Sequence, residues 1–510
     1  MSDTIGRISF YQEPQLAFGH GQFVEDPRDG LTLFGPLDEG TPLGIRVGVI
    51  GTRDGIEYFR RWLRRIQGFL VDKGKSKGLL IARPPFPGFR EAFRVPLVSE
   101  PVLTIEIPLA ELQHACSKDD QHQRVYGTVS CYADRLEASK RKEEIKPDLW
   151  FVVIPDVIYL TCRPLSRVPA ATVVKVERRL KPRYARGLHR QPTFFREENT
   201  LADQYRYAVD FRNQLKARLL KSLIPTQIVR ESTIGPPGVE IAPKRDMTNF
   251  QAAIAWNLAT TAYYKAGFKP WRLEGIRRGV CYIGLVFKRD DREADPRAAC
   301  CAAQMFLDSG DGTVFRGAVG PWYSTDKDEF HLTRTAAREL ATMALTSYKE
   351  KHEQQPPREL FIHGRVDFAV DEWRGFLDAI DTTKTQLVCV KIRDDVGMRI
   401  FRLGKRPVMR GCAYHQTDYR AFLWTRGHVP RLLTYVGREV PRPLVVDISR
   451  GQADLGVVLA DIMALTKLNY NGCMFADGVP VTIRFARAVG EILTAAPEVP
   501  ERPLQFKYYI

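Results

Sequence analysis

The residues best suited to chemistry in this sequence are an arginine and a lysine spaced one helical turn apart. Arg212 and Lys216 lie in F-R-N-Q-L-K-A-R-L-L-K, within a stretch whose apolar spacing predicts a helix over residues 201–223. Side chains four residues apart on a helix face the same way, so a guanidinium fork and an ammonium could meet the same phosphate oxygens. This spacing is also typical of a solvated, charged helix face.

Two more polar residues could add to this pair. Gln227 offers an amide donor from the loop after the helix, and Lys265 lies near the end of a second helix predicted over residues 250–268. A lysine there is also an ordinary C-terminal cation, stabilised by the helix dipole. Trp271 is expected in the core rather than as a platform for a base.

Motifs of several other enzyme classes are missing. The sequence contains no Walker loop, no G-x-S-x-G elbow and no dinucleotide-binding fingerprint. Asp367, Asp371 and Glu372 could imitate a metal-binding carboxylate set, but their spacing is more typical of a solvated loop and a helix start. Nine cysteines without a C-x-x-C pair, and no secretory signal, predict a cytoplasmic protein with free thiols.

The charge balance favours a polyanionic partner. The 510 residues include 76 Lys and Arg against 60 Asp and Glu, a formal net charge of +16. Each phosphate that a basic side chain neutralises releases condensed counterions, so nucleic acid is the first partner to consider, with an acidic protein as the alternative. No apolar run approaches the roughly 18 to 20 residues that a membrane span needs.

The first half of the chain has the pattern of an α/β domain with a parallel sheet. Buried strands are predicted over 45–50 and 149–160, with an amphipathic helix over 56–69 between them. Residues 1–40 are rich in Gly, Pro and Asp and predict short strands joined by turns. The strongly basic residues 163–198 are expected to form a solvated excursion.

The second half has the pattern of a sheet covered by helices. Strands are predicted over 280–287, 301–307, 359–363 and 387–392, and a helix over 333–349. This order is consistent with a ribonuclease-H-like domain.

Several stretches, taken in order, resemble the MID and PIWI halves of an Argonaute of the short prokaryotic type. They are Arg212-x3-Lys216-x10-Gln227, Tyr263-Y-K-A-G-F-K-P-Trp271, Leu465-T-K-L-N-Y-N, Val479-P-V-T-I-R-F-A-R and the aromatic C-terminus ending in Ile510. The resemblance implies an N-terminal strand and turn segment at 1–40, a MID domain with a Rossmann-like parallel sheet at 41–271, and a PIWI domain with a ribonuclease-H-like fold at 272–510.

The resemblance also assigns a site. It places the 5′ phosphate of a guide strand against Arg212, Lys216, Gln227 and Lys265. It gives the C-terminal carboxylate of Ile510 a magnesium ion shared with that phosphate, which suits a hard cation between anionic oxygens. Arg212 stands where many relatives have Tyr, so stacking on the first base is not carried over.

The resemblance implies that the carboxylates of cleaving Argonautes are lost. Those proteins hold two divalent ions with clustered carboxylates. The matching positions here are Val286 in Ile-Gly-Leu-Val, Arg365 in Phe-Ile-His-Gly-Arg and Arg487 in Phe-Ala-Arg. We therefore expect no slicing. The two arginines would either contact duplex phosphates or form structural salt bridges.

The function that the resemblance implies is sensing, not cutting. A small RNA guide would pair with single-stranded DNA and activate a separate TIR-APAZ or sirtuin-APAZ protein, bound as a heterodimer that oligomerises. That partner, not this chain, would consume NAD and cause abortive defence against plasmids or phage. The alternatives are a guide-dependent nuclease with an unrecognised carboxylate site and a nucleic-acid scaffold that needs no guide.

Overall fold

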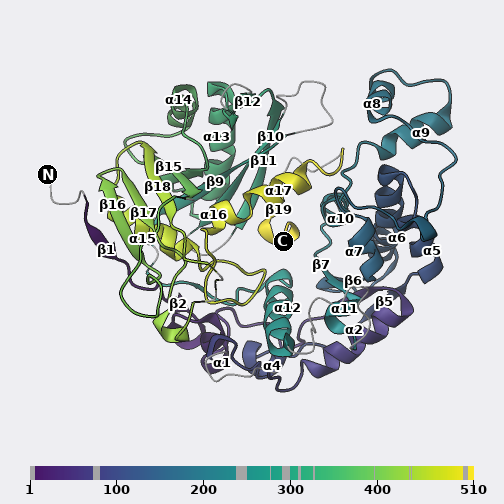
Figure 1. Ribbon diagram of the computed structural model, residues 1–510, viewed down its shortest axis with the longest axis horizontal. Helices are drawn as coiled ribbons and strands as arrows, with labels where there is room; N and C mark the ends of the chain where they lie inside the picture. The colour runs from purple at the N-terminus through teal and green to yellow at the C-terminus, as the bar shows by residue number, and fades with distance from the viewer. Residues whose placement is uncertain are drawn as a thin grey trace.

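The computed structural model describes residues 6–72, 81–236, 250–275, 277–289, 299–307, 312–324, 328–395, 397–435, 437, 439–497 and 504–510. Two lobes lie side by side, one built on a four-stranded sheet and the other on a ten-stranded sheet (Figure 1). Helix α12 (Gln251–Lys265) lies between and below them, and the C-terminus ends at the centre of the molecule.

The first lobe has a fully parallel sheet in the order β5-β4-β6-β7. Its elements are β4 (Val47–Gly51), α2 (Arg53–Arg65), α4 (Phe89–Phe93), β5 (Leu103–Glu106), α5 (Leu109–Cys116), α6 (Gln121–Lys142), β6 (Leu149–Ile154), α7 (Asp156–Thr161), α8 (Pro182–Arg190), α9 (Arg196–Gln204), α10 (Phe211–Leu219), β7 (Thr226–Arg230) and α11 (Glu231–Ile234).

Strand β6 shows why this sheet is covered on both faces. Leu149, Phe151 and Val153 pack into one core, while the alternate residues Trp150 and Val152 pack into another. Successive side chains of a strand point to opposite faces, so a continuous apolar run requires helices on both sides. This is the Rossmann-like parallel core expected for a MID domain.

The second lobe has a mixed sheet in the order β1-β16-β17-β18-β15-β14-β9-β10-β11-β19. Its elements are β9 (Val280–Arg289), β10 (Ala299–Leu307), β11 (Gly312–Gly320), β12 (Tyr323–Ser324), β13 (Glu329–Phe330), α13 (Arg334–Lys351), β14 (Glu359–Gly364), α14 (Val370–Asp378), β15 (Gln386–Asp394), β16 (Cys412–Thr417), β17 (Arg420–Leu423), β18 (Leu444–Arg450), α15 (Leu455–Leu465), α16 (Val481–Arg484), α17 (Ala486–Leu493) and β19 (Leu504–Gln505).

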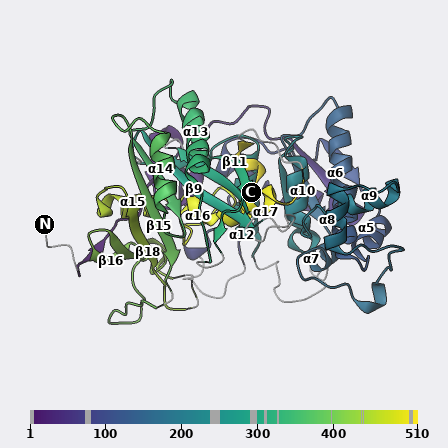
Figure 2. The same cartoon turned by 90° about the horizontal axis from the view of Figure 1, so that it is seen from above.

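The centre of this sheet is ribonuclease-H-like. Strands β9, β10 and β11 are antiparallel neighbours, and β14 and β15 continue the sheet parallel to β9. Cys281, Ile283 and Leu285 of β9 pack with α13 and α14, whereas Tyr282 and Val286 pack with the core that includes α15, α16 and α17. Figure 2 shows α17 between the large sheet and α10 of the first lobe.

The N-terminal segment ties the lobes together. Strand β1 (Ile8–Phe10) pairs with β16 at the edge of the large sheet, and β2 (Leu16–Ala17) lies between β3 (Phe23–Val24) and β8 (Arg272–Leu273). These short strands agree with the prediction for residues 1–40. The segment also contains a helix, α1 (Pro27–Leu33), which the sequence did not suggest; the Asp26 carboxylate caps it by accepting from the Arg28 amide.

Two predicted elements are wrong at their boundaries. The strand predicted over 149–160 is β6 followed by α7, because Pro155 ends the ladder and Asp156 begins a helix whose dipole favours a carboxylate in the first turn. The helix predicted over 201–223 is two helices, since Asp210 caps the start of α10 by accepting from the Asn213 amide at 2.9 Å.

The basic stretch 163–198 is not simply a solvated excursion. It contains α8 and the start of α9, which pack around a small core of Leu180, Ala185, Leu188, Ala202 and Tyr205. Few apolar residues are needed because two short helices in contact share one narrow seam.

Gly284 supplies a test of how β9 is packed. A Cβ at Gly284 would lie 2.1 Å from the carbonyl oxygen of Thr482 in α16. We expect Gly284→Ala to destabilise the fold by about 1 to 3 kcal/mol, as overpacking does. The measurement is the denaturant midpoint by circular dichroism. Gly187→Ala is the matched control, because a Cβ there meets nothing within 4 Å and helix α8 should gain about 0.5 to 1 kcal/mol. Equal midpoints for the two variants would contradict this packing.

Candidate anion-binding site

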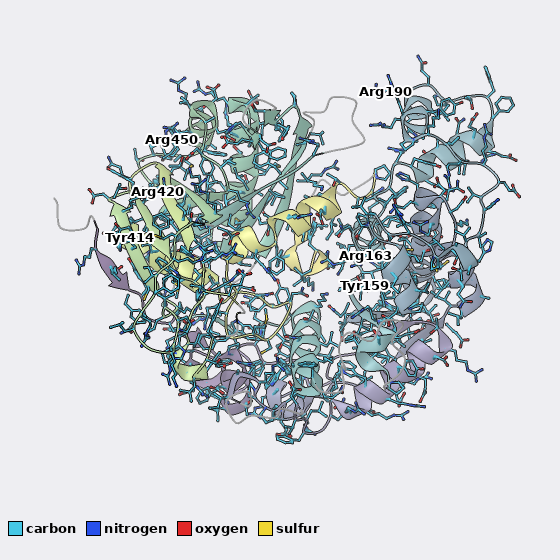
Figure 3. All side chains as sticks on the ribbon, in the orientation of Figure 1. Tyr159, Arg163, Arg190, Tyr414, Arg420 and Arg450 are labelled. Atoms are coloured by element: carbon cyan, nitrogen blue, oxygen red, sulfur yellow. The ribbon has the colours of Figure 1, made fainter. Side chains whose placement is uncertain are left out.

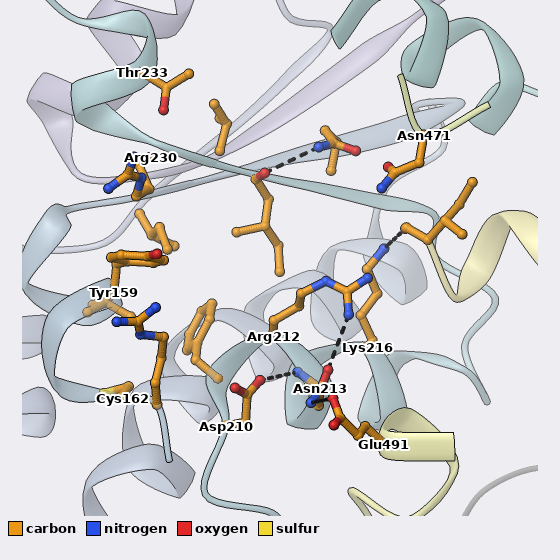
Figure 4. A pocket seen from close by; sticks show the side chains of 18 of the residues that line it. Tyr159, Cys162, Asp210, Arg212, Asn213, Lys216, Arg230, Thr233, Asn471 and Glu491 are labelled. Atoms are coloured by element: carbon orange, nitrogen blue, oxygen red, sulfur yellow. Dashed lines mark hydrogen bonds between the residues drawn. The ribbon is translucent and has the colours of Figure 1, made fainter. Parts of the chain in front are cut away.

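A pocket of about 480 Å³ opens where the two lobes meet (Figure 4). Its walls come from α7, α10, β7 and α12 of one side and from the C-terminal part of the chain on the other. The lining residues are Ile154, Ile158, Tyr159, Cys162, Arg163, Asp210, Phe211, Arg212, Asn213, Lys216, Gln227, Ile228, Val229, Arg230, Thr233, Leu258, Lys265, Asn471, Glu491 and Ile510.

Two buried lysines share one carbonyl oxygen at the back of this pocket. Lys216 of α10 and Lys265 at the end of α12 donate to the oxygen of Thr226 at 2.7 and 2.8 Å. Lys216 also donates to the main-chain oxygen of Ile510 at 2.5 Å, and Lys265 donates to the Gln227 Oε1 at 2.7 Å. Both lysines are almost completely buried, so two ammonium groups crowd one neutral acceptor.

This crowding disfavours the charged forms of both lysines. Burial, together with repulsion from the nearby Arg212, lowers the pKa of Lys265 to about 7. Burial also holds the pKa of Lys216 well below its usual range, with Lys265 and Arg212 adding repulsion. A bound anion would offset the repulsion between these cations, because it would add opposite charge beside the buried ammonium groups.

Arg212 extends the cationic wall. Its guanidinium donates to the carbonyl oxygen of Tyr509 and to Asn213 Oδ1, each at 3.2 Å. Burial lowers the pKa of Arg212, while Asp210 and Glu491 act in the opposite direction. This wall therefore brings three of the five cations that line the pocket together, and two carboxylates, Asp210 and Glu491, also line it.

The structure brings together all the residues predicted for the phosphate site. Arg212, Lys216, Gln227, Lys265 and Ile510 line the same pocket, although residue 212 and residue 510 are 298 positions apart. Their role toward a phosphate stays a prediction. Trp271 lies in the core, as expected, where its indole nitrogen donates to the carbonyl oxygen of Lys467 at 3.1 Å.

A stacked group on the opposite wall was missed from the sequence. The Tyr159 ring has the guanidinium of Arg163 4.0 Å from its centre and that of Arg230 4.5 Å from it. Figure 3 shows Arg163 next to Tyr159, and Figure 4 shows Tyr159 near Arg230 and across the pocket from Lys216. Residues 149–160 read as one strand, so the helical turn that presents Tyr159 could not be seen.

The resemblance predicts lost carboxylates at three positions, and each of these residues has other contacts. Val286 is buried in the core. Arg365 follows β14 and lies 3.7 Å from Asp394. Arg487 of α17 pairs with Glu491 at 2.8 Å, yet its side chain is 88% exposed.

The other acidic residues considered from sequence have structural partners. Asp367 pairs with Lys391 at 2.6 Å. Glu372 is buried, not solvated, and accepts from the amides of Leu332 and Ala369 at 2.7 and 2.8 Å, so it caps the start of α14. Asp371 lies exposed in the first turn of that helix.

Two further features are absent from the described part of the chain. Within it, no three His, Cys, Asp or Glu side chains lie close enough to hold a metal ion together. No helix in the same ranges has the length and apolar character needed to cross a membrane.

The sequence matches no protein-family model, and no curated protein matches it. Solved structures do match. They include Clostridium butyricum Argonaute bound to a guide DNA and a 19-mer target DNA, with 14% identity, a TM-score of 0.58, and coverage of 99% of this chain and 55% of that one. Aquifex aeolicus Argonaute and Drosophila Piwi each show 14% identity, a TM-score of 0.56, and coverage of 99% of this chain and 56% of theirs.

The chain thus spans little more than half the length of the structures it matches. Identity at this level bears on architecture alone. Taken with the parallel first sheet and the ribonuclease-H-like second sheet, the match establishes that this chain has the Argonaute fold, in its MID and PIWI halves.

Proposed function

We propose that this chain is the guide-binding subunit of a short prokaryotic Argonaute complex in the cytoplasm. It anchors the 5′ phosphate of a small RNA guide, pairs the guide with single-stranded DNA, and so activates a TIR-APAZ or sirtuin-APAZ partner. The partner depletes NAD in abortive defence against plasmids or phage. The observation that carries guide binding is the pair of buried lysines on one carbonyl oxygen. The partner and its effect rest on the sequence resemblance alone.

The chemistry of the pocket favours a terminal phosphate over an internal one. A terminal phosphate is a compact dianion, so it can compensate both buried ammonium groups at once, whereas a diester carries a single charge. Lys216 and Lys265 provide point charges, and Arg212 provides a fork. The Gln227 oxygen already accepts from Lys265, and its NH₂ group donates to the carbonyl oxygen of Ile228 at 3.3 Å, which leaves one N–H of that group for an anion.

The first nucleotide of the guide lies against the opposite wall in this proposal. Arg163 and Arg230 stack on Tyr159 and present guanidinium groups on the pocket side. Arginine planes and tyrosine rings both stack on nucleobases without strong sequence preference. This wall would hold the first base while the lysines hold its phosphate.

Magnesium is part of the proposal, and the pocket fits it. The main-chain oxygen of Ile510, the last residue of the sequence, accepts one hydrogen bond from Lys216. A carboxylate has about four lone-pair sites, so this group keeps capacity for a cation beside Lys216. Ile510 would hold the ion together with phosphate oxygens, as magnesium prefers. The ion would supply further neutralisation of the phosphate charge.

The chain itself is proposed not to cut. Hydrolysis by two metal ions needs clustered carboxylates, and the corresponding residues are Val286, Arg365 and Arg487. A nuclease with another carboxylate site and a scaffold that ignores the guide's 5′ end are the competing functions. Both make different predictions for the experiments below.

The lysine pair gives the first test. We expect the double variant Lys216→Met with Lys265→Met to weaken binding of a 5′-phosphorylated guide far more than binding of a 5′-hydroxyl guide. Each lost charged contact costs on the order of 1.5 to 3 kcal/mol. Fluorescence anisotropy with both guides measures the difference. Methionine keeps the buried volume, and Lys142→Met at the exposed end of α6 is the control for loss of charge. Equal weakening of both guides would support a scaffold and rule out this pocket.

The low pKa of Lys265 should make the affinity for a phosphorylated guide depend on pH. Its pKa is about 7 in the free pocket, and a bound phosphate must raise it, so binding takes up a proton above pH 7. We expect affinity for the 5′-phosphorylated guide to fall as pH rises from 7, by up to about tenfold per unit. The 5′-hydroxyl guide and Lys265→Met should lack this slope. Affinity that is flat or rising from pH 7 to 9 would contradict the linkage.

Metal removal separates anchoring from cutting. With a phosphorylated guide and a matched target, we expect magnesium to strengthen guide binding and yield no cleavage product. A chelator should weaken binding of the phosphorylated guide and leave binding of the 5′-hydroxyl guide unchanged. Extending the chain beyond Ile510 by a few residues should remove this magnesium effect, because it converts the carboxylate to an amide. Product that forms with magnesium and disappears with chelator would establish the nuclease instead.

A further inference from the structure

A second groove lies beside the phosphate pocket and has no role in the function proposed so far. Its volume is about 650 Å³, and it runs between the α8–α9 hairpin of the first lobe and the end of β9 with α17 of the second. The lining residues are His122, Pro164, Pro182, Arg186, Tyr205, Arg206, Tyr207, Ala208, Val209, Asp210, Asn213, Lys288, Arg289, Arg487, Glu491 and Thr494.

The groove is adjacent to the pocket, because Asp210, Asn213 and Glu491 line both. Figure 1 shows the α8–α9 hairpin at the upper right, above α6 and α10.

The hairpin is held in place, not loosely attached. Tyr205 donates its hydroxyl to Asp120 at 3.0 Å, and its ring stacks on His122 with centroids 4.6 Å apart. Arg179 forms an ion pair with Asp119 at 3.1 Å. These contacts fix the hairpin to the start of α6, so its groove-facing side chains are presented on a rigid support.

The groove carries an excess of positive charge. Residues 163–206 contain eleven Lys and Arg against four Asp and Glu, a net +7 within a chain whose total is +16. Five cations line the groove, namely Arg186, Arg206, Lys288, Arg289 and Arg487, against the carboxylates Asp210 and Glu491.

Glu491 cannot balance these cations, because it is already shared. It lies 2.8 Å from Arg487 and 4.0 Å from Lys288, and it also accepts from Asn213 at 3.3 Å. Opposed cationic walls with too few carboxylates concentrate a polyanion between them.

We propose that the α8–α9 hairpin clamps the sugar–phosphate backbone of the strand whose 5′ phosphate occupies the pocket. Arg186 and Arg206 contact its phosphates from one wall, and Lys288 and Arg487 contact them from the other. The proposal rests on the proposed function, since the pocket fixes which strand enters the groove. It assigns a binding role to an element that the sequence presented only as a basic stretch.

The test compares ligands that reach the groove with ligands that do not. The double variant Arg186→Gln with Arg206→Gln is measured against a 5′-phosphorylated dinucleotide and a guide-length 5′-phosphorylated single strand over a range of salt concentrations. We expect unchanged affinity for the dinucleotide. For the long strand we expect weaker binding and a salt slope reduced by about 1.4, since each phosphate contact on a single strand contributes about 0.7.

Arg183→Gln with Arg196→Gln is the matched control, because it removes the same charge from α8 and α9 at residues that do not line the groove. This control should leave the slope nearly unchanged. Equal slopes for the wild type and the groove variant on the long strand would overturn the clamp. Equal losses in both double variants would show general attraction to the hairpin and would also overturn it. Failure of the lysine pair to distinguish 5′ ends would instead refute the pocket, so the two failures are distinguishable.

Discussion

Two ammonium groups forced onto one carbonyl oxygen are the constraint on which the site depends. Neither Lys216 nor Lys265 can turn to solvent, because α10, α12 and the end of the chain enclose them. Thr226 supplies an acceptor but no charge, and one main-chain oxygen of Ile510 reaches only Lys216. This arrangement lowers the stability of the fold when the pocket holds no anion. A compact dianion would stabilise it most. A pocket of this kind is preorganised for a ligand rather than for the fold.

The two lobes are needed to build that constraint. Lys216 lies on α10, whose start is capped by Asp210, and Thr226 and Gln227 begin β7 of the parallel sheet. Ile510 arrives from the second lobe, where Tyr509 also accepts from Arg212 at 3.2 Å. Binding at such a junction is sensitive to how the lobes are placed. A ligand that joins the lysines to the C-terminus would also brace one lobe against the other.

Patterns among residues close in the sequence predicted local structure, whereas contacts between distant residues could not be predicted from spacing. The buried strands and the pairing of Arg212 with Lys216 follow from spacing, since both depend on residues a few positions apart. The meeting of Lys265 and Ile510 with that pair came only from family resemblance. Tyr159 was not predicted in a helical turn because Leu149 to Leu160 is apolar apart from Asp156, and the break at Pro155 and Asp156 was not recognised as the end of the strand. The apolar contact between α8 and α9 was not predicted, because basic residues outnumber the few apolar residues in this stretch.

The end of β9 in the second lobe lies beside cationic side chains. Gly284 and Val286 of β9 pack closely against α16 and α17, so a carboxylate at position 286 would be buried among apolar atoms. An acid placed there would therefore destabilise the lobe. Arg487 lines the groove beside the pocket, where Lys288 and Arg289 add positive charge. In the proposed function this charge suits contact with a nucleic-acid backbone.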